Sequence, residues 1–219
     1  ALAVAVFKGE KSSSDALKGL DKLTGGLIAS VMKAEEFKGD VGQTALLRFA
    51  AKGSIKASRL LLVGVGDKAE YKGSSVARAA GTATRFLRKR NVKSFGFLPR
   101  SSGGAVEAAQ NAVQGFITSQ FELDKYKTHD KNNKAVTGLV VCVDGARGSD
   151  LKDRIARGQA IGESMNFTSD LANEPPNILQ PTEMAKRAQT MAKSVGLKCE
   201  VYDEAWMIKQ GMGSLMSVT

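Results

Sequence analysis

Two adjacent prolines, Pro175 and Pro176, constrain the fold of this sequence more than any other feature. The residue before a proline is pushed out of the α region, and proline has no N–H to donate, so a helix that reaches them must end. Pro181 suits the first turn of a new helix, and apolar residues recur at helical spacing after it. The sequence therefore predicts one long helix over 151–171 and another over 181–195.

The composition is that of a globular protein, with 42% hydrophobic and 25% charged residues among 219. No window approaches the roughly 20 apolar residues that span a membrane, and residues 1–7 are too short for a signal peptide. We therefore expect a cytoplasmic protein with no membrane partner.

Cys142 and Cys199 lie far apart in the sequence, and neither has a partner at metal-ligand spacing. We therefore expect two buried free thiols.

Positive charge is concentrated in the first two thirds of the chain. Residues 1–150 contain 24 Lys and Arg against 14 Asp and Glu, whereas residues 151–219 contain 8 of each kind. This asymmetry supports a domain boundary near residue 150. A basic block can attract polyanions, although such a charge more often marks a solvated face. The candidate basic footprint consists of Lys125, Tyr126, Lys127, Lys131 and Lys134 together with Arg85, Arg88, Lys89 and Arg90.

Strand-like and helical segments alternate in this first block. The alternation predicts a mostly parallel sheet between helices, a three-layer α/β domain. The Gly-x-Gly of residues 64–66 lacks the further residues of a phosphate-binding fingerprint, so we interpret it as a turn. Strands are expected over 1–7, 43–50, 57–65, 95–98 and 137–144, and helices over 15–32 with an interruption at Gly25 and Gly26, over 74–91 and over 106–119.

Two finer expectations concern the end of this block. The unbroken apolar run over 139–143 is typical of a strand covered on both faces. Residues 121–133 are polar and are expected to form a loop. The helix over 106–119 is expected to face inward through Ala109, Val113, Phe116 and Ile117.

The second block begins another domain. Alternating apolar residues over 197–201 predict a strand, and Asp203 is expected to cap a short helix that ends at Gly211 and contains Trp206. The apolar surface is too small for an independent core. We therefore divide the chain into an amino-terminal α/β domain over 1–150, a linker helix over 151–173 and an incomplete α/β domain over 174–219.

Several motifs of the chain resemble the leucyl aminopeptidases, also called cytosol aminopeptidases (peptidase family M17). Residues 62–66 and 121–127 are similar to the amino-terminal domain of that family. Three further segments resemble the start of the family's catalytic domain. They are Asn173-Glu174-Pro175-Pro176-Asn177, Pro181-Thr182-Glu183-Met184-Ala185 and Gly211-Met212-Gly213-Ser214-Leu215. Gln180 departs from the hydroxyl residue common in the family, so the helix cap is weaker there or moves to Thr182.

The resemblance implies a macro-like amino-terminal domain and a cytoplasmic homo-hexamer with these domains outermost. It implies a metallo-aminopeptidase that uses two divalent metal ions, Zn or Mn, to release residues such as leucine from peptide substrates. The family motifs Lys-Gly-x-x-Phe-Asp and Asn-Thr-Asp-Ala-Glu-Gly-Arg do not occur in this sequence. No catalytic, cofactor-binding or metal-binding residue can therefore be assigned, and the chain alone is predicted to be inactive.

The chain's own polar residues do not suggest another active site. His129 lies in a polar stretch without a nucleophile to serve, and we expect it to be an exposed loop residue. Two other functions stay open: binding of nucleic acid or a phosphorylated ligand by the basic domain, or a non-catalytic assembly role. The acidic residues of the second block, which we expect not to form a metal site, are Asp170, Glu174, Glu183, Glu200, Asp203 and Glu204.

Overall fold

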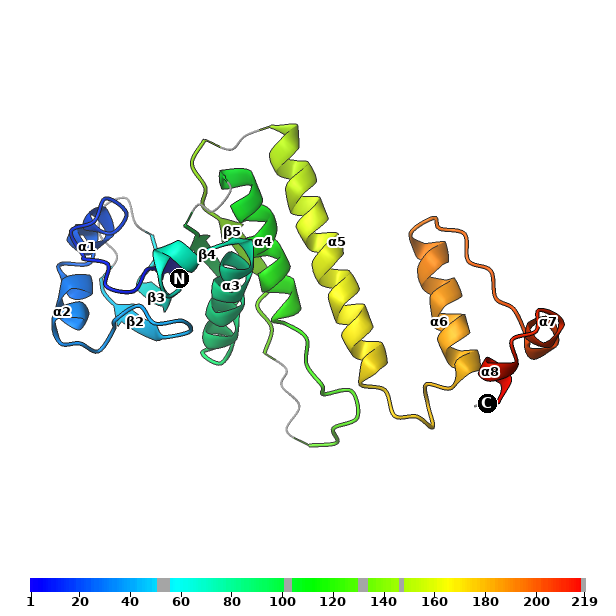
Figure 1. Ribbon diagram of the computed structural model, residues 1–219. Helices are drawn as coiled ribbons and strands as arrows, with labels where there is room; N and C mark the ends of the chain where they lie inside the picture. The colour runs from blue at the N-terminus through cyan, green and yellow to red at the C-terminus, as the bar shows by residue number, and fades with distance from the viewer. Residues whose placement is uncertain (51–55, 101–103, 130–133, 146–147, 218–219) are drawn as a thin grey trace. The chain divides into compact units, whose positions relative to one another are not determined.

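The computed structural model describes residues 1–50, 56–100, 104–129, 134–145 and 148–217. It divides into two compact units, Ala1–Ser169 and Asp170–Thr219. The described part of the first unit contains a five-stranded sheet in the order β2-β3-β1-β4-β5 (Figure 1). The strands are β1 (Leu2–Val6), β2 (Thr44–Arg48), β3 (Arg59–Gly64), β4 (Ser94–Leu98) and β5 (Gly138–Val141).

The sheet is mostly parallel, as the alternation of segments predicts. β1 pairs in parallel with β3 and β4, β4 pairs in parallel with β5, and β2 alone runs antiparallel, against β3. Alternate residues of a strand point to opposite faces. Ala3 and Ala5 pack into one apolar cluster and Val4 and Val6 into another, so β1 is buried on both faces.

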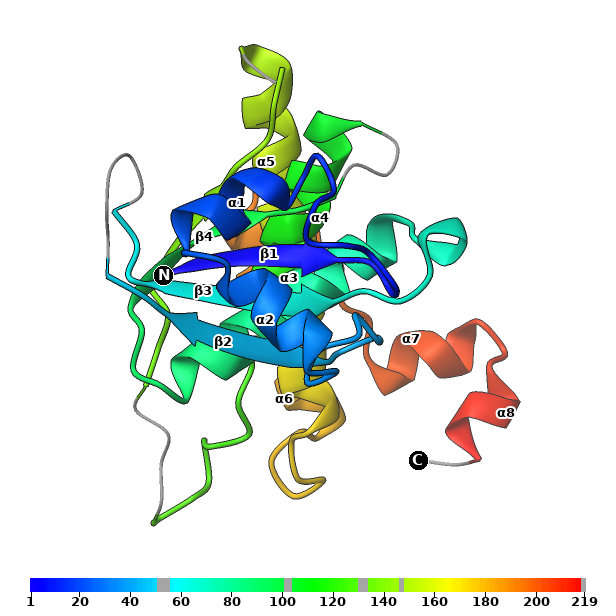
Figure 2. The same cartoon turned by 90° about the vertical axis from the view of Figure 1, so that its left-hand side faces the viewer.

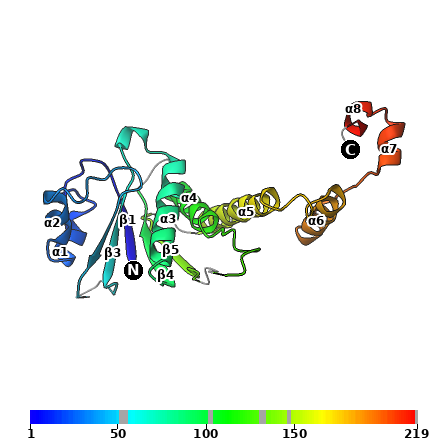
Figure 3. The ribbon, with the colours of Figure 1, turned by 90° about the horizontal axis from the view of Figure 1, so that it is seen from below.

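Helices cover both faces of this sheet, which makes three layers. Helices α1 (Lys18–Leu23) and α2 (Leu27–Lys33) lie in front of the strands in Figure 2. Helices α3 (Gly73–Arg88) and α4 (Ala105–Thr118) lie on the other face (Figure 3). Gly25 and Gly26, at φ of 72° and 85°, separate α1 from α2 because this left-handed conformation interrupts a helix. The short helix η1 (Lys68–Glu70) precedes α3.

Small residues bring α3 and α4 close together. A Cβ placed on Gly115 would lie 2.0 Å from the carbonyl oxygen of Ala77, so no side chain fits there. The sequence-based face of α4 was partly wrong. Ala109 is buried and Phe116 packs against the apolar core and the ring of Phe95, as predicted, but Val113 and Ile117 are only half-buried. The buried face is Ala108, Ala109, Ala112 and Gly115, because a close helix–helix approach selects small side chains rather than large apolar ones.

The expectation that the strand over 137–144 is covered on both faces was also wrong. The strand β5 forms the edge of the sheet, and Val140 is 65% exposed. An edge strand has a neighbour on one side only, and in the described residues no helix covers Val140. An unbroken apolar run therefore does not distinguish a central strand from an edge strand.

Helix α5 (Ser149–Ala172) packs against α4 along its first part. A Cβ on Gly158 would lie 2.4 Å from the carbonyl oxygen of Gln110, and one on Gly162 would lie 2.9 Å from Cβ of Ile117. Asn166 Nδ2 donates a hydrogen bond of 2.9 Å to the carbonyl oxygen of Ile117. The predicted linker helix is thus anchored to α4 by close backbone approach at Gly158 and Gly162 and by the side-chain hydrogen bond of Asn166.

The second unit is helical in its described residues. It contains α6 (Pro181–Ser194), α7 (Glu204–Lys209) and α8 (Gly213–Met216). The strand predicted over 197–201 does not form, and Leu197 and Val201 are 62% and 48% exposed. A strand needs a neighbour to satisfy its N–H and C=O groups, and the described part of this unit offers none. Residues 218 and 219 lie outside the described residues.

Candidate functional site

Three of the six acidic residues considered as metal ligands converge on one guanidinium group in the second unit. Arg187 Nη1 lies 2.7 Å from Glu174 Oε1 and 3.7 Å from Asp170 Oδ2, and Arg187 Nε lies 3.0 Å from Glu183 Oε1. The side chain of Glu174 is only 1% exposed. Hydrogen bonds from Arg187 to Glu174 and then Glu183 raise the pKa of Arg187. This cluster fixes the start of α6 beside the double-proline turn.

The remaining acidic candidates also have structural roles or partners. Glu200 forms an ion pair with Lys198 and accepts a hydrogen bond of 2.5 Å from the hydroxyl of Tyr202. Asp203 Oδ1 accepts a 2.9 Å hydrogen bond from the N–H of Trp206, which is the predicted helix cap. Glu204 lies in the first turn of the same helix, where a negative charge is favourable.

The described residues contain no group of three or more His, Cys, Asp or Glu side chains that could hold a metal ion. The acidic side chains considered as metal ligands in the sequence instead pair with Arg187 or Lys198, or lie at the start of α7. The side chains present here therefore do not fit a two-metal centre. Likewise, no helix in the described ranges has the length and hydrophobicity of a membrane span.

The other residues singled out by type are divided between the two units, with His129 and Cys142 in the first and Cys199 and Trp206 in the second. His129 is an exposed loop residue, as predicted. Cys142 and Cys199 are free, but both are half-buried, so the expectation of buried thiols was wrong in this respect. Burial raises the pKa of the Cys142 thiol. Trp206 stacks on Tyr202 with ring centroids 4.1 Å apart.

Fewer residues of the predicted basic footprint are exposed than the sequence suggests. Arg88 is buried, forms an ion pair with Glu122 and donates to the carbonyl oxygen of Ser119 at 3.4 Å. It therefore joins α3 to the segment after α4 and is not available to a polyanion. Lys131 lies outside the described residues. The exposed footprint residues are Arg85, Lys89, Arg90, Lys125, Tyr126, Lys127 and Lys134.

One polar cluster at the carboxyl edge of the sheet was missed by sequence reasoning. Arg100, just after β4, forms an ion pair with Glu10, just after β1, and its Nε donates to the carbonyl oxygen of Ala5 at 3.1 Å. Burial would raise the pKa of Glu10, but hydrogen bonds from Arg100, Ser14 and the Phe7 N–H outweigh it and leave that pKa lowered. The only clue available from sequence is that both residues follow predicted parallel strands.

A tyrosine and a phenylalanine complete this cluster. The hydroxyl of Tyr71 donates to the carbonyl oxygen of Arg100 at 3.3 Å, and burial raises the pKa of Tyr71 to about 12. The ring of Tyr71 meets the ring of Phe7 edge to face, with centroids 5.1 Å apart. Arg100 also lies 5.2 Å from the centroid of the Phe7 ring. The cluster ties together the segments that follow three strands of the sheet.

Two family models match the chain in order. Residues 3–130 match the N-terminal domain of the cytosol aminopeptidase family, and residues 166–219 match its catalytic domain. The probable cytosol aminopeptidase of Solibacter usitatus is 36% identical over 218 residues, covering 100% of this chain and 42% of the relative. That of Alkaliphilus metalliredigens is 30% identical over 224 residues, covering 100% and 44%. The chain thus spans less than half the length of these relatives.

Solved structures support the same fold. A variant of tomato leucine aminopeptidase superposes with a TM-score of 0.74 at 20% identity, covering 88% of this chain and 39% of that one. The bottromycin maturation enzyme BotP in complex with Mn gives a TM-score of 0.68 at 19% identity, covering 95% and 39%. At these identities the superpositions establish the fold alone.

Proposed function

Because the chain belongs to the cytosol aminopeptidase family, we propose that it forms the amino-terminal domain and the first part of the catalytic domain of a metal-dependent aminopeptidase. The observation that carries the proposal is that both domain models match in order, with the first part of α5 between them and its end inside the catalytic-domain match. The complete enzyme would release residues such as leucine from peptides in the cytosol.

The metal centre of that enzyme would consist of residues other than those described here. A co-catalytic pair needs several oxygen ligands around ions about 3.5–4 Å apart. The acidic residues of the second unit are instead engaged by Arg187, Lys198 and the first turn of α7. We propose two divalent ions, Zn or Mn, for the complete enzyme. BotP, which has the same fold, is described in complex with Mn.

We further propose that the complete protein is a homo-hexamer with the first unit on the outside. Apolar side chains of the second unit would then be covered by the rest of the catalytic domain. Those exposed here include Met184, Met191, Val195, Leu197, Val201, Ile208 and Leu215.

The test begins with the purified 219-residue chain. It is expected to release no p-nitroaniline from leucine-p-nitroanilide when Zn²⁺ or Mn²⁺ is added, and calorimetry is expected to show no stoichiometric metal binding. Turnover that depends on added metal and is abolished by a chelator would refute the assignment of the metal site to other residues.

Nucleic-acid binding by the first unit is a second candidate, supported by the exposed Arg85, Lys89 and Arg90 at the end of α3. Such binding would weaken steeply with salt, because it releases counterions. Charge reversal at Lys125 and Lys127 should abolish it. Failure of the chain to stay bound to heparin or DNA above about 50 mM salt would remove this candidate.

A purely structural role in assembly is the third candidate. It would appear as a difference in oligomer size between this chain and the full-length protein, measured by sedimentation.

A further inference from the structure

The chain leaves neighbouring strands of the first unit toward opposite faces of the sheet. After β1 it turns toward α1 and α2, whereas after β3 and β4 it turns toward α3 and α4 on the other face (Figure 3). In open α/β sheets such a reversal creates a crevice outside the carboxyl ends of the strands, and ligands bind there. The strand order of this unit therefore places a crevice beside the segment that follows β1.

One hollow occupies this position, and a second adjoins it on the side of α2. One has a volume of about 420 Å³ and is lined by the segment after β1, by Lys68 after β3 and by Arg100 after β4. The other has a volume of about 690 Å³ and lies between the segment 8–13 and the end of α2. Both include Lys8, Gly9 and Glu10 in their walls. Ligand pockets commonly measure about 300–1,000 Å³, so each hollow is large enough for a small molecule.

The carboxylates around these hollows are already engaged by cations. Glu10 pairs with Arg100, Asp15 pairs with Lys18 at 2.7 Å, and Glu35 pairs with Lys38 at 2.8 Å. Three further ammonium groups line the hollows without a carboxylate partner among the described residues: Lys11, Lys33 and Lys68. The walls therefore carry an excess of positive charge.

The segment between β1 and α1 also offers backbone donors. Within the described residues, the N–H groups of Ser12 and Ser13 have no protein acceptor. Gly9 has φ of 67° and open space where a Cβ would stand, so a ligand can approach its backbone. By contrast, the amides of Gly64 and Gly66 donate to the carbonyl oxygens of Gln43 and Gly39. These two amides are therefore not available to a phosphate. Gly64 ends β3 and residues 65–67 form no turn, so the interpretation of this segment as a turn was wrong in that respect.

The donor segment is held in place before any ligand arrives. Glu10 Oε2 accepts a 3.0 Å hydrogen bond from the N–H of Phe7, and Glu10 Oε1 accepts one of 2.7 Å from Ser14 Oγ. The N–H of Gly9 donates to the carbonyl oxygen of Lys38 at 3.1 Å. Fixing a binding segment in advance lowers the entropy lost on binding.

We propose that these hollows bind a small phosphorylated molecule. Lys11 and Lys33 hold its phosphate together with the amides of Ser12 and Ser13, and the uncharged part lies against Met32 in the larger hollow. Ammonium groups and backbone N–H groups are the donors that phosphate oxygens accept. The site is separate from the peptidase chemistry, so its existence does not depend on the proposed function.

Nuclear magnetic resonance of the ¹⁵N-labelled chain tests this proposal. Inorganic pyrophosphate and ADP are titrated separately, with adenosine as the uncharged probe. Both phosphorylated probes are expected to shift the amide resonances of Gly9, Ser12 and Ser13, and adenosine is not. The variant Lys11→Ala/Lys33→Ala should raise the Kd for ADP by at least about tenfold, because charge-assisted hydrogen bonds to the phosphate are lost.

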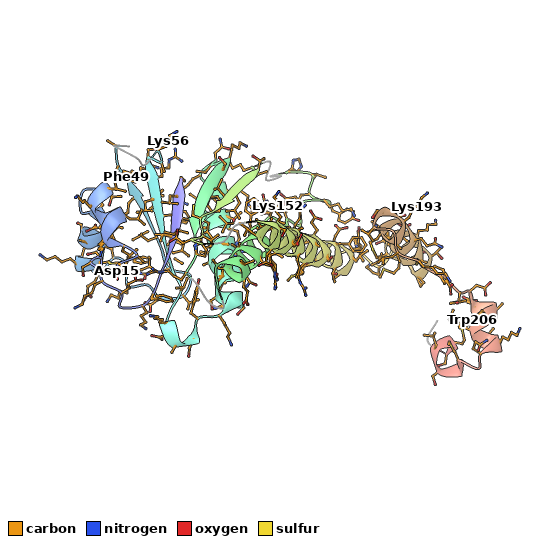
Figure 4. All side chains as sticks on the ribbon, turned by 90° about the horizontal axis from the view of Figure 1, so that it is seen from above. Asp15, Phe49, Lys56, Lys152, Lys193 and Trp206 are labelled. Atoms are coloured by element: carbon orange, nitrogen blue, oxygen red, sulfur yellow. The ribbon has the colours of Figure 1, made fainter. Side chains whose placement is uncertain are left out.

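The variant Lys56→Ala/Lys89→Ala is the matched control. It removes the same total charge, but Lys56 precedes β3 and Lys89 follows α3, so both lie at the amino edge of the sheet. Figure 4 shows Lys56 at the opposite end of the strands from Asp15. The control should leave the Kd for ADP within about twofold.

Three results would overturn the proposal. One is the absence of shifts at Gly9, Ser12 and Ser13 with both pyrophosphate and ADP. Another is an equal loss of affinity for ADP in the two double variants, which would show that ADP responds only to the net positive charge of the unit. The third is a single-stranded deoxyoligonucleotide that shifts these amides while ADP does not. Far-UV circular dichroism of each variant establishes that it is folded.

Discussion

Arg100 and Arg187 each join segments that are distant in sequence or separated by a turn. Arg100 connects the end of β4 with Glu10, 90 positions earlier. Arg187 connects α6 with Glu174 across the two prolines. Sequence reasoning could place Pro181 in the first turn of α6, because that depends on local spacing. It could not pair Glu10 with Arg100, because their proximity depends on the order of the strands.

Removal of Arg187 should destabilise the second unit. Arg187→Ala removes the cation that lies 2.7 Å from the buried carboxylate of Glu174, and removing one partner of a buried ion pair is strongly unfavourable. Trp206 is the only tryptophan in the chain, so its fluorescence reports on this unit during urea unfolding. The urea midpoint should fall well below that of Lys193→Ala, an exposed residue in the last turn of the same helix. Equal midpoints would show that the cluster contributes nothing.

The carboxyl group of Glu10 should make the first unit sensitive to acid. Its pKa is lowered in the folded state from an ordinary value of 4.5, so its ionised form stabilises the fold. That contribution is complete above about pH 4.5 and is lost as the pH falls through the lower folded pKa.

The difference in unfolding free energy between the parent chain and Glu10→Gln should therefore shrink between about pH 6 and pH 3. Urea unfolding followed by far-UV circular dichroism measures it. Glu107→Gln, at an exposed position of α4, is the control. A difference that stays constant across this range would contradict the role given to Glu10.

At the scale of elements, the sequence specifies local structure better than packing. The helices before and after the prolines and the alternating strands and helices of the first unit form where they were predicted. The strand over 197–201 failed because its hydrogen-bond partner would have to come from elsewhere. The buried face of α4 was partly misjudged because the prediction left out Gly115, which is a point of close approach to Ala77.

The contact between α3 and α4 gives a prediction with an internal control. Gly115→Ala should destabilise the first unit by about 1–3 kcal/mol or more, since the added Cβ would overlap the backbone of Ala77. Gly19→Ala makes the same change in α1 with open space around it. It should be neutral or stabilise by up to about 1 kcal/mol through helix propensity. Thermal unfolding of both variants checks this, and equal effects would rule out tight packing at Gly115.

At the scale of the whole molecule, the two units differ in how much apolar surface they bury. The first unit contains two apolar clusters, one on each face of the sheet. In the described part of the second unit, Ala192 is the only buried apolar residue. The sequence predicted this imbalance, because the elements after the prolines are short and together offer too little apolar surface for an independent core.

This imbalance predicts two unfolding transitions in the isolated chain. The fluorescence of Trp206 should change at a lower urea concentration than the far-UV circular dichroism, which is dominated by the first unit. Transitions that coincide for both probes would indicate one cooperative domain. In native-state hydrogen exchange, the amides of residues 198–203 should exchange fast and those of β1 and β3 slowly.

The proposed function is tested most directly by a chimera. In it, this chain replaces the aligned 218 residues of the Solibacter usitatus relative, which is 36% identical over that range. The proposed function predicts an assembled protein that hydrolyses leucine-p-nitroanilide only when Mn²⁺ or Zn²⁺ is present. A chimera that folds, assembles and binds metal like its parent but shows no turnover would contradict it.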